Sequence, residues 1–288
     1  MRGLASRCVD HGPLDGTNPT VIKGLSVYRR NSPSDPVHAV YGRSLFLVCQ
    51  GRKQARVGDD RFVYDPDHYL VTSVPLPVLS EILMASPERP FLALALDVDL
   101  EEVRAIIARA GDVLAPSAAG APGRGLAACP MTPPLRDLAG RLLDLLEQPE
   151  DIPVLAPLYR LELLYHVLKG PRGGFLRAVA MGQGQQHAIG EVLSIIHADC
   201  SHSFTVSELA SRAGMSESVF YEAFKSVTAE TPLRYIKRLR LQEAHRQLTL
   251  GLDNVSGVAH AVGYNSLSQF SREFTRVFGT NPSSCLPR

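Results

Sequence analysis

Hydrophobic residues in the first hundred positions come in short runs that are separated by Gly, Pro and Asp. Runs rich in Val, Leu, Phe and Tyr, bounded by such turn residues, are typical of β-strands. The clearest runs occupy residues 25–30, 44–51, 61–64, 68–74 and 91–99. The Gly-Asp-Asp segment 58–60 follows a further run at 54–57, which predicts a β-hairpin. Residues 24–96 therefore predict an antiparallel β-sandwich or a small barrel.

The pattern changes after residue 97, where apolar residues recur at the spacing of an amphipathic helix. Residues 100–110 place their large apolar side chains on one face, and residues 135–147 and 155–169 predict two further helices. Residues 115–130, rich in Ala, Gly and Pro, predict an exposed loop. The two later helices have apolar faces to bury, either against the β domain or against a second copy of the chain.

The last third of the chain contains an internal repeat, in which residues 207–232 resemble residues 256–282 with one insertion. The matched pairs are Leu209 and Val258, Ala210 and Ala259, Gly214 and Gly263, Ser216 and Ser266, Phe220 and Phe270, Phe224 and Phe274, and Pro232 and Pro282. The small Ala lets two helices cross closely, the Gly supplies a positive φ, and the Ser caps the second helix. The two Phe residues form the buried stripe of that helix. Each copy therefore predicts a helix-turn-helix.

A single copy of this pattern also fits an ordinary packed helical hairpin. Two copies about 50 residues apart, joined by a basic helix at 232–248, are much more specific. Residues 263–282 resemble the AraC/XylS family of regulators, in which a Gly-aromatic turn precedes Ser, Phe, a basic residue, a further Phe and Asn-Pro. The resemblance implies two three-helix subdomains bridged by one long helix, so that one chain reads successive major grooves of DNA.

Residues 41–78 resemble the N-terminal domain of AraC-type regulators, which implies a cupin-like β-sandwich followed by helices. We therefore predict an α+β multidomain chain whose second part is an all-α domain of two helix-turn-helix subdomains. An effector and dimerisation domain is expected at 20–180 and a DNA-binding domain at 187–288. The length of 288 residues fits this division into two domains.

A recognition helix presents its first turn and its outward positions to the edges of the bases. The predicted base-reading residues are Ser218, Tyr221 and Glu222 in the first unit, and Ser268, Ser271, Arg272 and Arg276 in the second. We expect Arg272 to contact a guanine, since a guanidinium can donate to two acceptors on one base; a solvated arginine is the alternative. Ser218 and Glu222 depart from the larger or basic residues of the family, so the second unit should set more of the specificity.

Four further basic residues are expected to contact phosphates and to carry affinity and salt dependence. They are Lys225, Lys237, Arg238 and Arg240. Residues 203–288 contain 10 Lys or Arg and 7 Asp or Glu, whereas residues 1–202 contain 20 and 22. This mild asymmetry permits a nucleic-acid partner for the last third but does not indicate one by itself.

The composition is that of an ordinary globular protein, with 45% hydrophobic and 20% charged residues. The chain has no run of about 20 apolar residues, and its first residues lack the pattern of a secretion signal. We therefore expect a cytoplasmic protein with no membrane partner. Its cysteines are never spaced as CxxC, which disfavours a disulfide framework and a zinc site. They are Cys8, Cys49, Cys129, Cys200 and Cys285.

If the β domain were a metal-dependent enzyme, His and Glu residues would have to converge on one face of the barrel to bind the metal. His38 and His68 are isolated, and no GxSxG, P-loop or HExxH motif is present. We therefore predict no enzyme activity, no metal and no cofactor. Cys49 lies in an apolar run, where it is either a sensor thiol for an electrophile or oxidant, or inert packing.

Together these features predict a bacterial transcription regulator that binds double-stranded promoter DNA and responds to an unidentified small-molecule effector. The resemblance favours an activator over a repressor, which implies contact with RNA polymerase. A homodimer through 135–147 or 155–169 stays open against the use of these helices in the domain's own core. Two other classes remain as alternatives: a metal-dependent cupin-type enzyme fused to a helical interaction domain, and a module whose helix pairs bind proteins.

Overall fold

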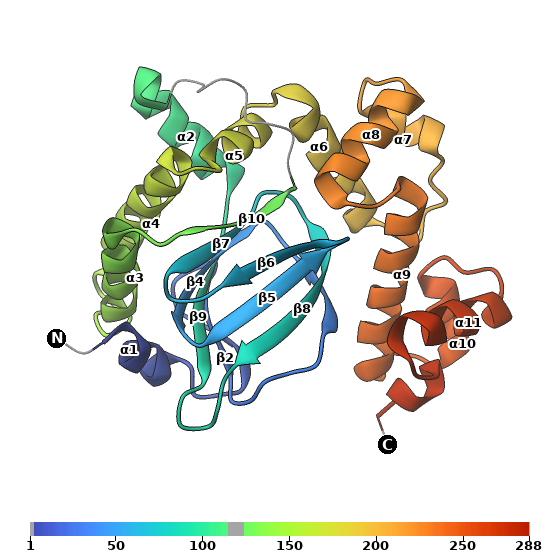
Figure 1. The fold of residues 1–288 in the computed structure, drawn as a ribbon, viewed down its shortest axis with the longest axis horizontal. Coiled ribbons are helices and arrows are strands. Elements are labelled where there is room, and N and C mark those ends of the chain that lie inside the picture. Colours follow the sequence, from blue (N-terminus) through green and yellow to red (C-terminus); the bar gives the residue numbers. More distant parts are fainter. Residues whose placement is uncertain (1–2, 115–123, 288) are drawn as a thin grey trace.

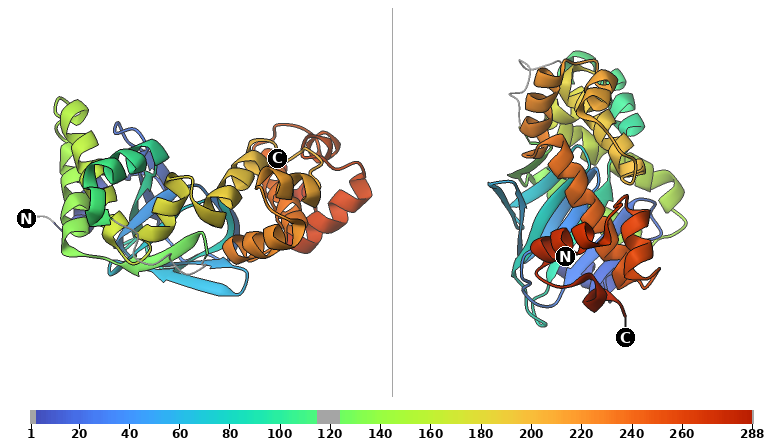
Figure 2. Two further views of the ribbon diagram at one scale, coloured as in Figure 1. Left: turned by 90° about the horizontal axis from the view of Figure 1, so that it is seen from above. Right: turned by 90° about the vertical axis from the view of Figure 1, so that its right-hand side faces the viewer.

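The computed structural model describes residues 3–114 and 124–287. In this part of the chain two antiparallel β-sheets face each other and form a sandwich (Figure 1). One group of helices covers the outer side of the sandwich, and the C-terminal helices form the opposite end of the molecule (Figure 2). The predicted fold class, a β-sandwich with helices followed by an all-α part, is confirmed.

The larger sheet has the strand order β1-β2-β9-β4-β7-β10, and the smaller sheet has the order β3-β8-β5-β6. The strands are β1 (Gly16–Pro19), β2 (Leu25–Arg30), β3 (Val37–Tyr41), β4 (Ser44–Gln50), β5 (Arg52–Val57), β6 (Asp60–Tyr64), β7 (His68–Thr72), β8 (Leu76–Met84), β9 (Phe91–Asp97) and β10 (Leu126–Pro130). The predicted hairpin is confirmed, because β5 pairs directly with β6 and Gly58 takes a φ of +61° at their turn.

Strand β9 shows how the larger sheet separates two cores. Leu92, Leu94 and Leu96 pack against the helices, whereas Phe91 and Ala93 lie in the core inside the sandwich. This alternation follows from the two-residue period of a strand that is buried on both faces. The covering helices are α1 (Leu4–His11), α2 (Leu100–Ala110), α3 (Pro133–Leu145), α4 (Ile152–Lys169) and α5 (Gly173–Ala180), with a short 3₁₀ helix η1 (Gly111–Leu114) after α2.

One prediction about the first domain was wrong. Residues 126–130 of the expected loop form β10, which pairs with β7, while residues 115–123 lie outside the described residues. Packing also extends to residues before 20, the expected start of the domain: β1 pairs with β2, and α1 packs on the larger sheet. Strand β10 consists mostly of small residues, so its place in the sheet comes from backbone pairing with a distant strand rather than from a local hydrophobic pattern.

The described residues of the C-terminal part form six α-helices. They are α6 (Gly184–Ala198), α7 (Val206–Arg212), α8 (Glu217–Thr228), α9 (Pro232–Thr249), α10 (Val255–Ala261) and α11 (Leu267–Phe278), followed by the 3₁₀ helix η2 (Pro282–Cys285). Helices α6, α7 and α8 pack together, and α10 and α11 pack on the second half of α9. The long helix α9 therefore joins two compact helical units, as the resemblance implied.

The hydrophobic core does not stop at the predicted boundary between residues 180 and 187. Val74 and Leu76 of the sandwich belong to the same buried cluster as Ile189 of α6 and Phe224 of α8. The second helical unit instead has a core of its own, built around Phe270. The first unit is thus packed onto the β-sandwich, and the second unit extends from it.

Candidate nucleic-acid interface

Both predicted helix-turn-helix units are present, and the same residue types build their turns. Gly214 and Gly263 take φ values of +64° and +88°, in the left-handed region that favours glycine. The hydroxyls of Ser216 and Ser266 cap the next helix by accepting from the backbone amide three residues later. The repeat seen in the sequence is therefore a repeat of structure.

The second helix of each unit is anchored by two phenylalanines. Phe220 and Phe224 of α8, like Phe270 and Phe274 of α11, are fully buried. The two rings of each pair lie 5.5 Å apart, because residues four positions apart share one face of a helix. Anchoring on this face leaves the opposite face of α8 and of α11 available to a partner.

On α11 the outward face carries an unpaired positive charge. Ser268, Arg272 and Arg276 are exposed and follow one another at four-residue spacing, so they form one row along the helix. Within residues 3–114 and 124–287 neither arginine makes an ion pair or a side-chain hydrogen bond. Ser271 is half-buried beside the row. The second unit therefore presents two guanidinium groups that have no competing partner in the described protein.

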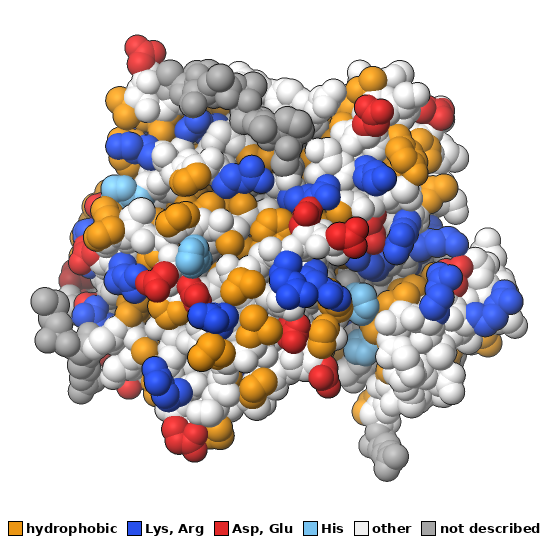
Figure 3. Space-filling view, viewed as in Figure 1, with side chains coloured by type: hydrophobic (Ala, Val, Ile, Leu, Met, Phe, Trp, Pro, Cys, Tyr) orange, Lys and Arg blue, Asp and Glu red, His pale blue; other side chains and the backbone are white. Residues whose placement is uncertain are grey.

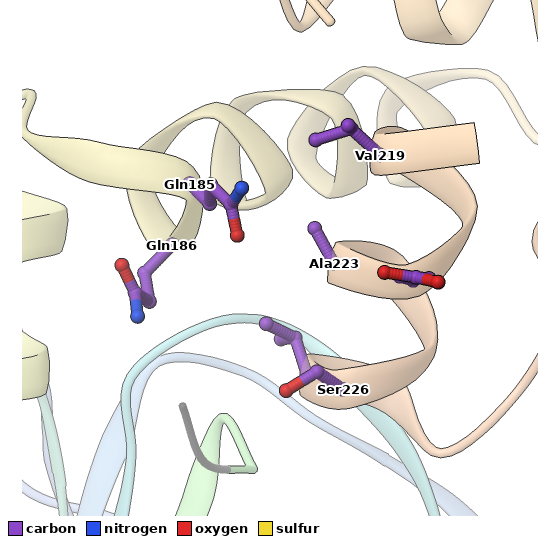
Figure 4. Close-up of a pocket in the computed structure, with 7 residues that line it drawn as sticks. Gln185, Gln186, Val219, Ala223 and Ser226 are labelled. Atoms are coloured by element: carbon purple, nitrogen blue, oxygen red, sulfur yellow. The ribbon is translucent and has the colours of Figure 1, made fainter. Parts of the chain in front are cut away.

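On α8 the outward face is polar and less basic. Ser218, Tyr221 and Glu222 are exposed, and Tyr221 retains 41% of its accessible surface. Glu222 also lines a cavity of about 350 Å³ together with Gln185 and Gln186 of α6 (Figure 4). The remaining lining residues are Val219, Ala223, Ser226 and Val227. Glu222 thus belongs both to the outward face of α8 and to the lining of this cavity.

The four expected phosphate contacts fall into two groups. Lys225 is exposed near the end of α8, and its ammonium has no ion-pair partner among the described residues. Lys237 is also exposed, but its Nζ lies 3.0 Å from Oε1 of Glu273 and so joins α9 to α11. Lys237 can exchange this surface partner for a phosphate, because an exposed ion pair contributes little free energy.

Arg238, expected at a phosphate, points into the β-sandwich instead. Its Nη2 donates to the carbonyl of Pro77 at 3.0 Å and lies 3.2 Å from the carboxylate of Glu230. Burial lowers the pKa of Arg238 and raises the pKa of Glu230, and the opposite charge of each residue counteracts the shift of the other. In this structure Arg238 is a structural residue and is not available to DNA.

Arg240 also differs from the expectation. Its guanidinium donates to the carbonyls of Cys200, Ser201 and His202 in the loop after α6, and to that of Gly263 in the second turn. These bonds connect the two helical units on either side of α9. Since four of its five donors are already used, Arg240 fixes the relative position of the units instead of contacting a phosphate.

A contact that the sequence did not reveal joins the β-sandwich to α9. Tyr235, Arg238 and Gln242 lie on one face of that helix and donate to the carbonyls of Pro75, Pro77 and Ala39, respectively. Their spacing of three and four residues is the only signal that could have marked this face. We call this set the α9 contact row. Through it, the helix that joins the two DNA-binding units is held by strands β3 and β8 and the residues next to them.

Further contacts extend this interface at both ends. Arg124 donates to the carbonyls of Lys225 and Ser226 on α8, and the ring of His38 on β3 packs against Phe278 of α11 at 5.5 Å. The first domain therefore touches both helix-turn-helix units.

On the face in view in Figure 3, Lys and Arg side chains gather over α9 and α11.

The first domain contains the histidines considered as metal ligands and the cysteine considered as a sensor thiol. His68 pairs with Asp65, and the described residues contain no group of three or more His, Cys, Asp or Glu side chains that could hold a metal ion. Cys49 is half-buried at the end of β4, with its Sγ 2.9 Å from Sγ of Cys8. Sequence reasoning missed Cys8 as its neighbour, because nothing local connects α1 with β4.

Comparison with known proteins identifies the family. The AraC-type transcriptional regulator N-terminus matches residues 21–175, which are more than half of the chain, and a helix-turn-helix domain matches residues 209–288. The chain belongs to the AraC family of transcriptional regulators. This assignment agrees with the two-domain architecture and with the paired helix-turn-helix units.

Individual relatives match only part of the chain. An AraC-like transcription regulator of Streptomyces antibioticus is 42% identical over 94 residues, which are 33% of this chain and 31% of that protein. The transcriptional activator RhaS of Pectobacterium carotovorum is 30% identical over 122 residues, or 42% of this chain and 43% of RhaS. These matches span less than half the length of either relative.

A solved structure of similar fold covers nearly the whole chain. ToxT from Vibrio cholerae aligns with a TM-score of 0.55 and 11% identity over 92% of this chain and 98% of ToxT. At this identity the likeness concerns the fold alone. No helix in the described part of this AraC-family chain is both long and apolar enough to cross a membrane.

Proposed function

We propose that this chain regulates transcription by binding promoter DNA, with α8 and α11 in successive major grooves. The observation that carries the proposal is the pair of equivalent helix-turn-helix units, each anchored by two buried phenylalanines and joined by one helix. Arg272 and Arg276 are exposed and unpaired, as a base-reading row requires. The activator RhaS is a relative, which favours activation and therefore contact with RNA polymerase.

The two recognition helices have unequal roles in this proposal. On α11, Ser268, Ser271, Arg272 and Arg276 read bases, and Arg272 donates to a guanine. On α8, Ser218 and Tyr221 contribute fewer base contacts, and Glu222 is set against the cavity beside α6. Lys225 and Lys237 bind phosphates and supply affinity without sequence preference.

Equilibrium binding to the DNA upstream of the chain's own gene tests the role of Arg272. Arg272→Ala should weaken binding to the cognate duplex by about 1–3 kcal/mol, roughly 5- to 150-fold, and relax the preference at one base. Binding to random DNA should change little. Lys225→Ala is the matched control, since it should weaken both duplexes equally and lower the salt slope by about 1. Equal losses for Arg272→Ala on both duplexes would contradict the assignment.

We further propose that the sandwich interior binds the effector and that Lys53 of β5 is its anchor. Lys53 is buried, and its ammonium lies 4.3 Å from the ring centre of Tyr28 with three more rings around it. These are the rings of Tyr41, Phe46 and Phe91. No carboxylate of the described residues forms an ion pair with Lys53. A buried cation among aromatic rings suits a carboxylate that carries an apolar chain.

ToxT of Vibrio cholerae has been solved with an unsaturated fatty acid bound, which gives a first ligand to test. Unsaturated fatty acids should raise the thermal midpoint of the full chain, because ligands of the native state stabilise it. Lys53→Met keeps the length of the side chain but removes its charge, and it should abolish most of that rise. An equal rise in both proteins would place the ligand elsewhere.

The α9 contact row suggests how an effector reaches the DNA-binding units. Three buried polar atoms at this interface lack a hydrogen-bond partner among the described residues: Nδ1 of His38, Nε of Arg238 and Oε1 of Gln242. Each such atom reduces the stability of the docked arrangement by about 1–3 kcal/mol. The interface is therefore less stable than its number of hydrogen bonds suggests. We propose that the effector shifts the balance between this docked arrangement and a released one that binds DNA differently.

A further inference from the structure

Two cysteines that are far apart in sequence meet beside the larger sheet. Cys8 lies on α1 and Cys49 at the end of β4, 41 positions later, and their sulfur atoms are 2.9 Å apart. A disulfide bond is about 2.0 Å long, so the sulfurs need to approach by roughly 0.9 Å. Helix α1 has only eight residues and no side-chain cap at its start, and its packing against β4 keeps the two sulfur atoms together.

The two thiols differ in access. Cys8 is fully buried in the core between α1, α3 and the larger sheet, whereas Cys49 is only partly buried. The contact with the Cys49 thiol, together with burial, raises the pKa of Cys8 far above its usual range. Cys49 is therefore the sulfur that a dissolved reagent reaches first, and Cys8 is the sulfur held next to it.

The other three cysteines are not arranged in this way. Cys129 is buried next to the hydroxyl of Tyr69, and Cys200 and Cys285 belong to the C-terminal helical part. None of them is in contact with a second thiol in the described part of the chain. The close pair is thus a specific feature of α1 and β4.

We propose that Cys8 and Cys49 form a redox site that is oxidised by hydroperoxides to an intramolecular disulfide. The thiolate of Cys49 attacks one peroxide oxygen, the O–O bond breaks, and a sulfenic acid and water result. The sulfur of Cys8 then attacks the sulfur of Cys49, the S–O bond breaks, and the hydroxide leaves as water with the proton of Cys8. Two thiols and one hydrogen peroxide give one disulfide and two waters, and the two electrons pass to the peroxide.

The product ties α1 to β4 and closes a loop of about 40 residues. Such a crosslink restricts the unfolded chain and should stabilise the first domain. Thiol reductants reverse it, because thiol–disulfide exchange restores both cysteines. This site stands on the contact of the two sulfur atoms and does not depend on the proposed DNA-binding function.

Treatment of the full chain with hydrogen peroxide, followed by alkylation and peptide mass spectrometry, tests the proposal. We expect the wild type to lose two of its five free thiols first, with a crosslinked peptide that contains Cys8 and Cys49. The thermal midpoint of the full chain should rise by roughly 5 °C or more, and dithiothreitol should reverse the rise. Consumption of other thiols without this crosslink would overturn the proposal, and this readout needs no variant.

Two variants sharpen the test. Cys8→Ala should leave Cys49 without its partner, so that peroxide drives Cys49 onward to sulfinic acid. Cys285→Ser removes a thiol from the C-terminal part and should leave the crosslink unchanged. If Cys49 of the wild type and of Cys8→Ala accumulates sulfinic acid at the same rate, Cys8 has no part in the reaction.

Discussion

Among single residues, His197 of α6 connects titration with the interface between the domains. Its Nε2 lies 2.7 Å from the hydroxyl of Tyr235, which donates to the carbonyl of Pro75 on the sandwich side. Burial lowers the pKa of His197 to about 4, whereas an unfolded histidine titrates near 6.5. The unfolded chain therefore binds more protons than the folded chain between these two values.

Protonation of His197 therefore destabilises the folded chain at acidic pH. The stability that neutral His197 contributes is fully present above about pH 6.5 and is lost as the pH falls toward 4. Between pH 7 and pH 5 we expect a loss of about 2 kcal/mol from this residue. Urea denaturation across this range should show the loss in the wild type and a shallower slope in His197→Gln. Identical slopes would contradict the assignment.

The basic residues of α9 and α11 show why single-residue roles were only partly predictable. Arg272 and Arg276 were placed on an outward face by the helical period, and the structure leaves both exposed. Arg238 and Arg240 fit the same rule, yet their partners lie at Pro77 and in the loop after α6. Those partners are 40 or 161 positions away, so only the assembled fold could reveal them.

At the scale of helices and strands, local chemistry was the better guide. The glycine turns and serine caps of the two units were visible in the sequence, because each depends on a few neighbouring residues. Strand β10 and helix α1 were missed, since their positions depend on pairing and packing with distant segments. The closeness of Cys8 and Cys49 was missed for the same reason.

The ends of α8 and α11 provide a test at this scale. Gly279 ends α11 with a φ of +71°, whereas the equivalent Ala229 ends α8 with a φ of +63°. A methyl group added at Gly279 meets no atom within 4 Å, so any cost of Gly279→Ala comes from the backbone conformation. We expect a loss of about 1 kcal/mol in the free energy of unfolding, measured by urea denaturation.

Gly42→Ala is the matched control for that measurement. Its added methyl group also meets nothing within 4 Å, but its backbone is not in the left-handed region. The control should be neutral or slightly stabilising, because alanine has fewer unfolded conformations than glycine. Similar losses in both variants would show that the backbone conformation of Gly279 is not the cause.

At the scale of the whole molecule, the first domain packs on the first helical unit and contacts the second. The sandwich core continues into α6 and α8, the α9 contact row is bonded to strands β3 and β8 and their flanks, and His38 touches Phe278. Arg240 then fixes one unit against the other. The spacing of the two recognition helices is therefore set by bonds within the protein before any DNA is present.

Footprinting of the full chain on the DNA upstream of its own gene tests the central claim most directly. Two helix-turn-helix units in successive major grooves should protect two patches on one face of the duplex, about 10 base pairs apart. Arg272→Ala should weaken the protection of one patch far more than the other. A single patch, or protection that random DNA competes away equally well, would contradict the claim that both units read DNA.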